Sequence, residues 1–144
     1  MQNHQLAIAS DHAGIDLKDE IIKFLQKKDV IVVDLGANNL ERVDYPDYAH
    51  NLMEKIIEGS VEHGILICAT GIGMSMTANR SSDIRAALCT TEFMAERARL
   101  HNDANILVLG AKIINSDTAL KIVDTFLNTE FEGGRHAHRL AKIS

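Results

Sequence analysis

Five short apolar runs alternate with amphipathic stretches along this chain, and this alternation limits its fold more than any other feature. The runs are apolar at successive positions, and they lie at 6–9, 30–35, 64–68, 84–89 and 106–109. Strands that are buried on both faces of a parallel sheet have this pattern. The sequence therefore predicts a doubly wound α/β fold, with a five-stranded parallel sheet and helices on both faces in a Rossmann-like three-layer sandwich.

Helices are expected between the strands, because apolar residues recur there at near-helical spacing. Their expected positions are 15–25, 45–59, 74–79, 91–100 and 116–127. In the first helix Lys18 falls on the polar face, and in the second Pro46 suits the first turn. Asn115 or Ser116 is the expected cap of the last helix. Nothing marks a second domain, so we expect residues 1–144 to form one domain with a basic tail at about 133–144.

Charge, hydropathy and cysteine content exclude several classes of protein. The chain has 15 Lys and Arg against 20 Asp and Glu, a formal net charge of −5, so a nucleic-acid-binding protein is not expected. No apolar run approaches the roughly 20 residues of a membrane span, and no secretory signal is visible. Cys68 and Cys89 are too few for a disulfide framework and lack the spacing of metal ligands. We therefore expect a cytoplasmic protein with reduced thiols.

The segment after the 64–68 run is the most informative, because ligands of doubly wound folds bind beyond the carboxyl ends of strands. Residues 69–73 can bend sharply and point N–H groups outward at a helix start, which suits anionic oxygens. A tight strand–helix connection explains the same residues, and the segment is neither a Rossmann nor a Walker A motif. Cys68 precedes this turn, where the positive end of a helix favours a thiolate. A buried core thiol is the alternative for Cys68 and the better interpretation of Cys89.

Other polar residues lie where strands or helices are expected to end. Asp11 and His12 follow the first run and can orient ligand hydroxyls, although Asp11 can equally cap the first helix. His101 follows the 91–100 helix. It suits a general acid or base, and histidine is also common at ordinary helix ends. Arg135 and Arg139 are four residues apart, so on a helix they share one face and suit a phosphate. A solvated basic terminus is the alternative.

Taken together, five segments in this order resemble the B-type ribose-5-phosphate isomerases, a family that includes galactose-6-phosphate isomerase subunits. The segments are Ser-Asp-His-Ala-Gly (10–14), Asp-Tyr-Pro-Asp-Tyr-Ala (44–49), Gly-Ile-Leu-Ile-Cys-Ala-Thr-Gly-Ile-Gly-Met-Ser (64–75), His-Asn-Asp-Ala-Asn (101–105) and Glu-Gly-Gly-Arg-His (132–136). The resemblance covers nearly the whole chain. It implies an aldose–ketose isomerase of the pentose phosphate pathway that interconverts ribose 5-phosphate and ribulose 5-phosphate. It also implies no metal or organic cofactor, and homodimers, sometimes tetramers, with active sites at the interface.

The resemblance also implies roles for individual residues. Cys68 resembles the proton acceptor that moves a proton between sugar C1 and C2, and His101 resembles the acid that helps to open the furanose ring. Removing a proton beside a carbonyl requires a base and donors for the developing oxyanion, which Cys68 and the amides after it would supply together. The expected substrate contacts are Asp11, His12, Tyr45, Ala69, Thr70, Gly71, Ile72, Gly73, Asn102, Lys112, Arg135 and Arg139.

Three positions depart from the family pattern. Met74 stands where some members have a carboxylate base, which favours the thiol as the base here. Ala69 replaces a frequent glycine, and Lys112 replaces a frequent arginine, which keeps the charge but loses the bidentate fork. The shape of the pocket, and with it the identity of the sugar, is therefore not fixed by these residues. The alternatives are a galactose 6-phosphate or allose 6-phosphate isomerase and a non-catalytic sugar-phosphate-binding module.

The predicted topology separates the two residues with catalytic roles. His101 ends a helix that spans roughly 15 Å and runs back from the carboxyl ends of the strands, so it should lie near the opposite edge of the sheet from Cys68. We therefore expect a second subunit to supply His101 to the site that contains Cys68.

Overall fold

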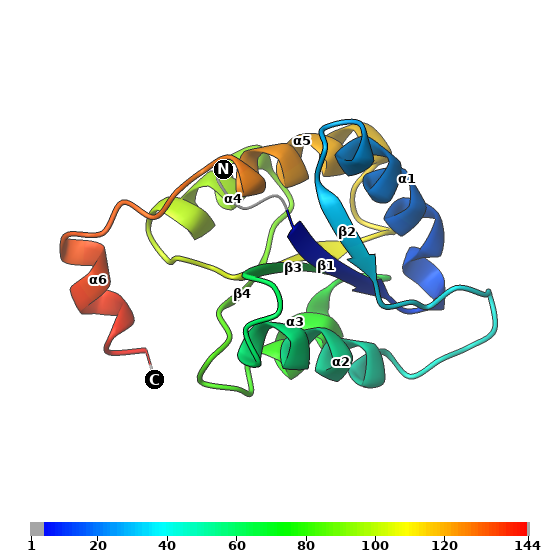
Figure 1. Ribbon diagram of the computed structural model, residues 1–144, viewed down its shortest axis with the longest axis horizontal. Coiled ribbons are helices and arrows are strands. Elements are labelled where there is room, and N and C mark those ends of the chain that lie inside the picture. Colours follow the sequence, from blue (N-terminus) through cyan, green and yellow to red (C-terminus); the bar gives the residue numbers. More distant parts are fainter. Residues whose placement is uncertain (1–4, 144) are drawn as a thin grey trace.

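The structure, a computed structural model that describes residues 5–143, is a five-stranded parallel sheet between two layers of helices (Figure 1). The strands are β1 (Gln5–Ser10), β2 (Ile31–Asp34), β3 (His63–Cys68), β4 (Ala86–Leu88) and β5 (Ile106–Gly110). Their order in the sheet is β2-β1-β3-β5-β4, and every neighbouring pair is parallel. The predicted doubly wound α/β fold is confirmed.

Helices follow the strands in the predicted alternation. They are the 3-10 turn η1 (His12–Gly14) and the helices α1 (Ile15–Gln26), α2 (Tyr45–Ile57), α3 (Ile72–Ala78), α4 (Glu92–Leu100), α5 (Ser116–Leu127) and α6 (Arg135–Leu140). Side chains cap two of them as their residue types favour: Thr91 Oγ1 accepts the Met94 amide, and Asn115 Oδ1 accepts the Thr118 amide. Between residues 5 and 143, no helix has the length and apolar content to cross a membrane.

Each face of the sheet has its own core. Alternate side chains of β1 show this, because Leu6 and Ile8 pack with α1, α4 and α5, whereas Ala7 and Ala9 pack with α2 and α3 (Figure 1). The three central strands are buried almost throughout. Cys68 lies on the α2–α3 side and Cys89 on the other side.

The edge strands differ from the prediction that all strands are buried on both faces. Ile31 in β2 is 64% exposed, and β4 is only half-buried and shorter than the predicted run 84–89. An edge strand is more exposed because it has one neighbouring strand instead of two. Apolar content alone does not give the order of the strands, so it does not identify the edge strands. Helix α3 also begins earlier than predicted, at Ile72.

The assignment of Lys18 to a polar, solvent-facing side of α1 is wrong. Its side chain is fully buried, and its ammonium group donates to Asp34 Oδ1 at 2.7 Å and to Asn38 Oδ1 at 3.1 Å. Asp34 Oδ1 also accepts the Gly36 amide at 2.9 Å. The chain that leaves β2 thus folds over Lys18 and supplies a partner for its charge, as a buried ammonium requires.

His63, at the start of β3, makes folding sensitive to acid. Its Nδ1 is buried without a hydrogen-bond partner, and its ring meets Phe126 edge-to-face at 6.1 Å between centroids. Burial, followed by the positive charge of Arg99, lowers the pKa of His63 from its ordinary 6.5. The folded protein therefore favours the neutral imidazole. Above pH 6.5 His63 does not reduce the free energy of unfolding, and below pH 6.5 this free energy falls, because the unfolded chain takes up the proton more readily.

We predict that the melting temperature falls when the pH is lowered from about 7.5 to about 5, and that His63→Gln reduces this fall. Thermal unfolding followed by circular dichroism across this range measures both slopes. His50→Gln, at an exposed position on α2, is the matched control and should keep the slope of the parent protein. An unchanged slope in His63→Gln would contradict the role of His63.

Candidate active site

Cys68 is the last residue of β3, and its sulfur is held by the turn that follows it. Gly71 donates its amide to Cys68 Sγ at 3.1 Å. This return of the chain needs a left-handed residue, and Gly71 has φ +84°. A Cβ at Gly71 would also lie 2.5 Å from Leu88 Cδ1, so the position requires glycine for space as well as for conformation. The Cys68 side chain is 5% exposed, at the carboxyl edge of the sheet.

The turn is anchored to the neighbouring strand. The Ala111 and Lys112 amides, just after β5, donate to the carbonyls of Cys68 and Ala69, both at 2.9 Å. Two parallel strands thus end side by side and are joined beyond their last pair. The resemblance makes Lys112 an expected substrate contact, and the structure brings its backbone into contact with the turn.

The same turn presents backbone amides. Thr70 Oγ1 accepts the Ile72 amide at 3.2 Å. The first helical backbone hydrogen bond of α3 runs from the Ser75 amide to the Gly71 carbonyl. The earlier amides of Gly73 and Met74 have no acceptor within the helix. These N–H groups, near a sulfur, form a place where negative oxygen can be stabilised.

Tyr45 covers the turn from the start of α2. A Cβ at Gly73 would lie 2.7 Å from Tyr45 Oη, so the phenol ring packs directly on this glycine. Tyr45 is 38% exposed, which leaves part of the ring open. The ring thus lies against the 69–73 turn, and its role as a wall of the site stays a prediction.

Asp11 and His12 lie at the same edge of the sheet, at the end of β1. The Asp11 amide donates to the carbonyl of Ile67 at 3.1 Å, and Asp11 Oδ1 accepts the Ala13 amide at 3.0 Å. Asp11 therefore caps the 3-10 turn η1 instead of the first α-helix. His12 Nδ1 accepts the Val43 amide at 3.3 Å, so in neutral His12 the proton is on Nε2. The carboxyl edge thus brings together Asp11, His12, Tyr45, Cys68, Ala69, Thr70, Gly71, Ile72, Gly73 and Lys112.

His101 lies at the opposite end of the sheet. Cys68 pairs with Gly110 and Gly64 pairs with Ile106, so β3 and β5 begin together and end together. His101 follows α4 and precedes β5, and is therefore beyond the amino ends of these strands. Four residues of strand correspond to roughly 13 Å. Within one chain, the predicted acid is thus separated from the predicted base, as the topology argument expected.

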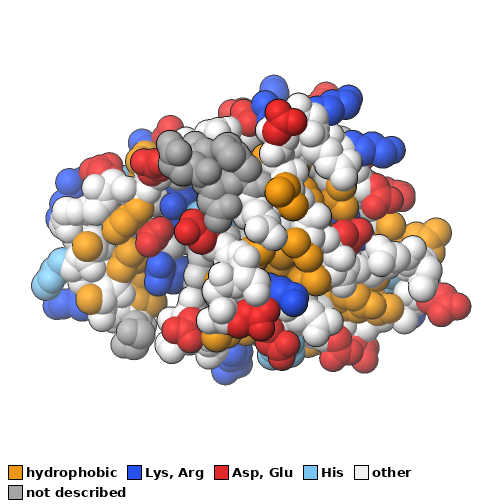
Figure 2. All heavy atoms as spheres, in the orientation of Figure 1, with side chains coloured by type: hydrophobic (Ala, Val, Ile, Leu, Met, Phe, Trp, Pro, Cys, Tyr) orange, Lys and Arg blue, Asp and Glu red, His pale blue; other side chains and the backbone are white. Residues whose placement is uncertain are grey.

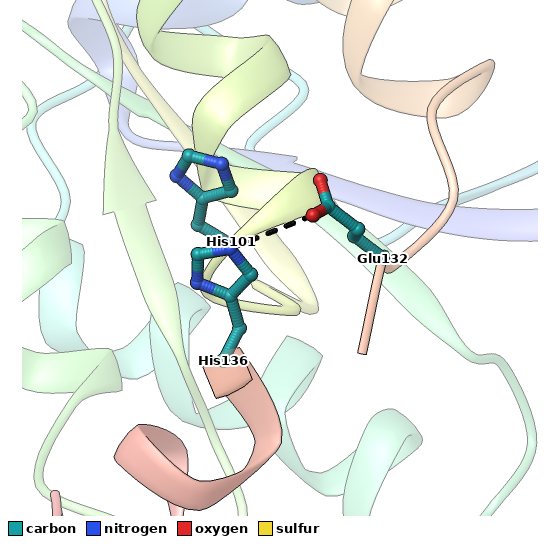
Figure 3. Close-up of side chains that lie close together, drawn as sticks. All are labelled: His101, Glu132 and His136. Atoms are coloured by element: carbon teal, nitrogen blue, oxygen red, sulfur yellow. Dashed lines mark ion pairs between the residues drawn. The ribbon is translucent and has the colours of Figure 1, made fainter. Parts of the chain in front are cut away.

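The His101 ring stacks on His136 of α6, with 4.1 Å between centroids and 13° between planes (Figure 3). Glu132 Oε1 lies 3.8 Å from His136 Nε2, at the i,i+4 spacing. Burial, then His101 and Arg135, lowers the pKa of His136, which favours its neutral form. His136 belongs to the predicted basic tail, but its stack on His101 is not predicted from the sequence; the i,i+4 spacing of Glu132 and His136 is the one local signal.

These three side chains also carry possible metal ligands. One nitrogen or oxygen atom from each of them lies within 4.8 Å of the other two. An imidazole lone pair lies in the plane of its ring. The two nearly parallel, stacked rings therefore direct their lone pairs along separate planes rather than toward one ion. The observed arrangement of His101, Glu132 and His136 favours ring stacking over metal coordination.

The C-terminal helix carries the other predicted anion contacts. Arg135 and Arg139 are exposed on α6, and neither forms an ion pair within residues 5–143. Figure 1 shows α6 standing beyond the β4 edge, and Figure 2 shows basic and His side chains around hydrophobic ones on this lobe. A cavity of about 470 Å³ between α6 and the β4 edge is lined by residues that include Asn102, Leu140 and Ile143. The second group of predicted site residues thus comprises His101, Asn102, Arg135 and Arg139.

Comparisons with known proteins agree on one family. The model of the Ribose/Galactose Isomerase family matches residues 6–143. A protein named putative sugar phosphate isomerase from Rickettsia conorii is 56% identical over 143 residues, which cover 99% of each chain. Ribose-5-phosphate isomerase B of Escherichia coli is 41% identical over 140 residues, covering 97% of this chain and 94% of that one.

Solved structures show the same likeness. The ribose 5-phosphate isomerase of Thermotoga maritima has a TM-score of 0.95 and 50% identity, with 96% of both chains covered. Ribose-5-phosphate isomerase B of Mycoplasma genitalium, solved with bound ribulose-5-phosphate, has a TM-score of 0.93 and 44% identity. Coverage is 96% of this chain and 93% of that one.

The two cysteines should differ in reactivity. Burial raises the pKa of the Cys89 thiol to about 12, so this thiol stays protonated at about pH 8. Cys68 instead has an amide directed at its sulfur. We predict that iodoacetamide labels Cys68 in the native protein and labels Cys89 only after unfolding, as measured by peptide mass spectrometry. Equal labelling of the two native cysteines would contradict this assignment.

Proposed function

Since the chain belongs to the ribose/galactose isomerase family, we propose that it is an aldose–ketose isomerase that interconverts ribose 5-phosphate and ribulose 5-phosphate. The observation that carries this proposal is the Cys68 sulfur at the carboxyl end of β3, which accepts the Gly71 amide in the turn that leads into α3. Both cysteines are free, which fits the cytoplasmic location that we include in the proposal.

Proton transfer is assigned to Cys68. Its thiolate removes the proton from C2 of the open-chain aldose, and the electron pair moves to the C1 carbonyl oxygen to give an enediolate. The proton of the C2 hydroxyl passes to the C1 oxygen, Cys68 returns its own proton to C1, and a ketone is left at C2. The amides of the 69–73 turn stabilise the oxygen that becomes negative, a contribution that typically changes rates by about 10²–10³-fold per donor. Met74 is fully buried and has no group that can accept a proton, so it does not compete as the base.

Ring opening is assigned to His101 of a second copy of the chain. Ribose 5-phosphate is a furanose in solution, so an acid or base must act on the ring before C2 is accessible. His101 lies beyond the amino ends of the strands in its own chain, away from Cys68. A two-fold interface would bring each His101 to the other subunit's Cys68 and complete two equal sites.

Exposed apolar residues support association with a second copy. Ile72 and Met76 on α3 are 55% and 62% exposed, and Phe93 on α4 is 63% exposed. The cavity beside α6 adds further apolar surface, including Ile143. Exposed apolar surface of this kind is typical of association surfaces. We therefore propose a homodimer as the functional unit.

The phosphate is assigned to the basic residues of α6 together with Lys112. Arg135 and Arg139 share one face of α6 and are exposed without ion-pair partners among residues 5–143, so they are free to bind a dianion. Lys112 lies beside the turn that holds Cys68. Binding the phosphate away from C1 and C2 helps to hold the reacting carbons against the base.

We predict that Cys68→Ala lowers kcat for ribose 5-phosphate by about 10²–10⁴-fold, because it removes the base, and that KM changes little. Cys89→Ala is the matched control, since that thiol also ends a strand run and is buried, but stays protonated. A coupled assay of both variants provides the measurement. Retained turnover in Cys68→Ala would eliminate the proposed base.

Co-expression of two inactive variants tests the shared site. Cys68→Ala and His101→Asn each disable every site in their own homodimer. If each site takes Cys68 from one subunit and His101 from the other, random mixing restores about a quarter of the parental activity, through one intact site per mixed dimer. If both residues act within one chain, the mixture stays as inactive as its parents. Each variant expressed alone is the control.

A further inference from the structure

Asp103, two residues after His101, has an unusual backbone conformation. Its φ is +46°, and the only other described non-glycine residue with a positive φ is Asp29. Left-handed backbone is unfavourable for residues with a side chain and persists when surrounding contacts enforce it. Asparagine or glycine would normally suit this position better. Contacts of the Asp103 side chain are therefore expected to hold this conformation.

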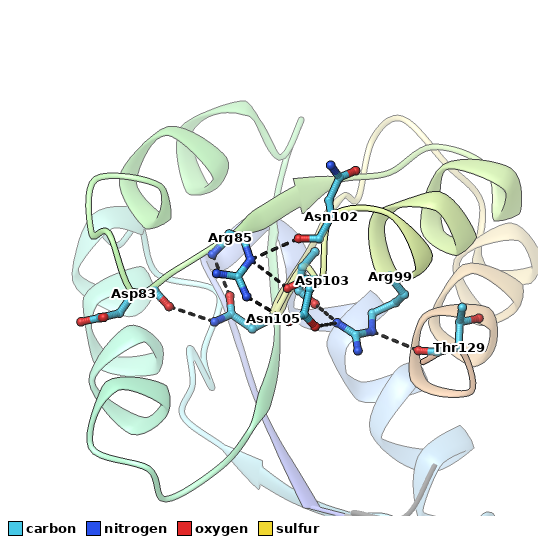
Figure 4. A network of polar contacts seen from close by, with 8 residues as sticks. Asp83, Arg85, Arg99, Asn102, Asp103, Asn105 and Thr129 are labelled. Carbon is cyan, nitrogen blue, oxygen red and sulfur yellow. Dashed lines mark hydrogen bonds and ion pairs between the residues drawn. The ribbon is translucent and has the colours of Figure 1, made fainter. Parts of the chain in front are cut away.

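Two arginines bind opposite oxygens of this carboxylate (Figure 4). Arg99 Nη1 donates to Asp103 Oδ1 at 2.9 Å, and Arg85 Nη2 donates to Asp103 Oδ2 at 3.2 Å. Arg99 comes from α4, whereas Arg85 immediately precedes β4. Asp103 thus links the helix that ends at His101 to the edge of the sheet.

Both arginines also hold the backbone around His101. Arg85 Nε donates to the carbonyls of Asn102 and Asp103, at 3.1 and 3.0 Å. Arg99 is 7% exposed and donates to the carbonyls of Ala104 at 2.7 Å and Thr129 at 3.1 Å. Every carbonyl from 102 to 104 therefore accepts a hydrogen bond from a guanidinium.

Stability alone is a weak reason for the Arg85–Asp103 ion pair. The Arg85 and Asp103 side chains are 36% and 35% exposed, and ion pairs at such exposure add little to the free energy of unfolding. Geometry is what the arrangement does supply, because a guanidinium with several fixed acceptors leaves the chain few alternatives. His101 is at the end of α4, where a helix would otherwise fray.

We propose that Arg85, Asp103 and Arg99 are positioning residues, which hold His101 and Asn102 in place to open the furanose ring. This inference rests on the proposed function. The three residues reach no reacting atom; they act through the 101–104 backbone, while His136 holds the His101 ring from its other side. Loss of this support should impair ring opening and leave proton transfer at Cys68 intact.

Asp103→Asn is the decisive variant. Asparagine tolerates left-handed backbone and keeps an oxygen for Arg99, while Arg99 retains the Ala104 and Thr129 carbonyls, so the variant is expected to fold. Two reactions are compared. Isomerisation of ribose 5-phosphate requires ring opening, whereas exchange of a C1 proton of ribulose 5-phosphate with D₂O requires only the base, since this ketose is open-chain.

We expect Asp103→Asn to lower turnover of ribose 5-phosphate by about tenfold or more, while C1 exchange stays within about twofold of the parent rate. Lys28→Ala is the matched control, because it breaks an exposed ion pair with Asp124 in which Arg85, Arg99 and Asp103 take no part, and both rates should be unchanged. Undiminished turnover, or an equal loss of turnover and exchange, would overturn the proposal.

A second measurement separates this inference from the proposed function. The imidazole resonances of His101 should shift or broaden in Asp103→Asn, whereas those of His50 on α2 should stay as in the parent protein. Unperturbed His101 resonances would overturn the positioning role even if turnover fell. If the parent protein catalysed neither reaction, the proposed function would fail, and the His101 resonances would still decide whether the arginines position this residue.

Discussion

The common direction of the five strands is the constraint on which the rest of this protein depends. In a parallel sheet every strand ends at the same edge of the sheet, and every connection must return the chain to the opposite edge, where the next strand begins. Cys68 and its turn belong to the first edge, while His101 and the α6 arginines belong to the returning segments. In the proposed dimer, one chain therefore contributes half of a site at each end of its sheet, and two copies related by a two-fold axis complete both halves.

The two cysteines are both buried, but they differ in the backbone that surrounds their sulfurs. Both side chains are almost inaccessible, and each lies in an apolar core. Burial raises the pKa of Cys89 to about 12, so it acts as a small hydrophobic side chain. Cys68 ends a central strand just before a left-handed glycine, and that turn directs an amide at its sulfur. The difference comes from Gly71 and the carbonyl anchors of the turn.

Much of this arrangement follows from local sequence signals. Successive apolar residues predict the strands, Pro46 and Asn115 mark helix starts, and the strand-end rule selects the segment after β3. Contacts between distant segments carry no such signal. Lys18 shows the periodicity of a surface residue, but the chain after β2 covers it. The Arg99–Thr129 contact joins residues 30 positions apart, and the His101–His136 stack depends on where α6 lies.

The most direct test of a site divided between two chains is a crystal structure of the Cys68→Ala variant with bound ribulose 5-phosphate. We expect C1 and C2 of the sugar to lie beside residue 68 of one subunit, and the phosphate to contact the arginines on α6 of the other. A sugar phosphate whose contacts all come from a single chain would contradict this expectation.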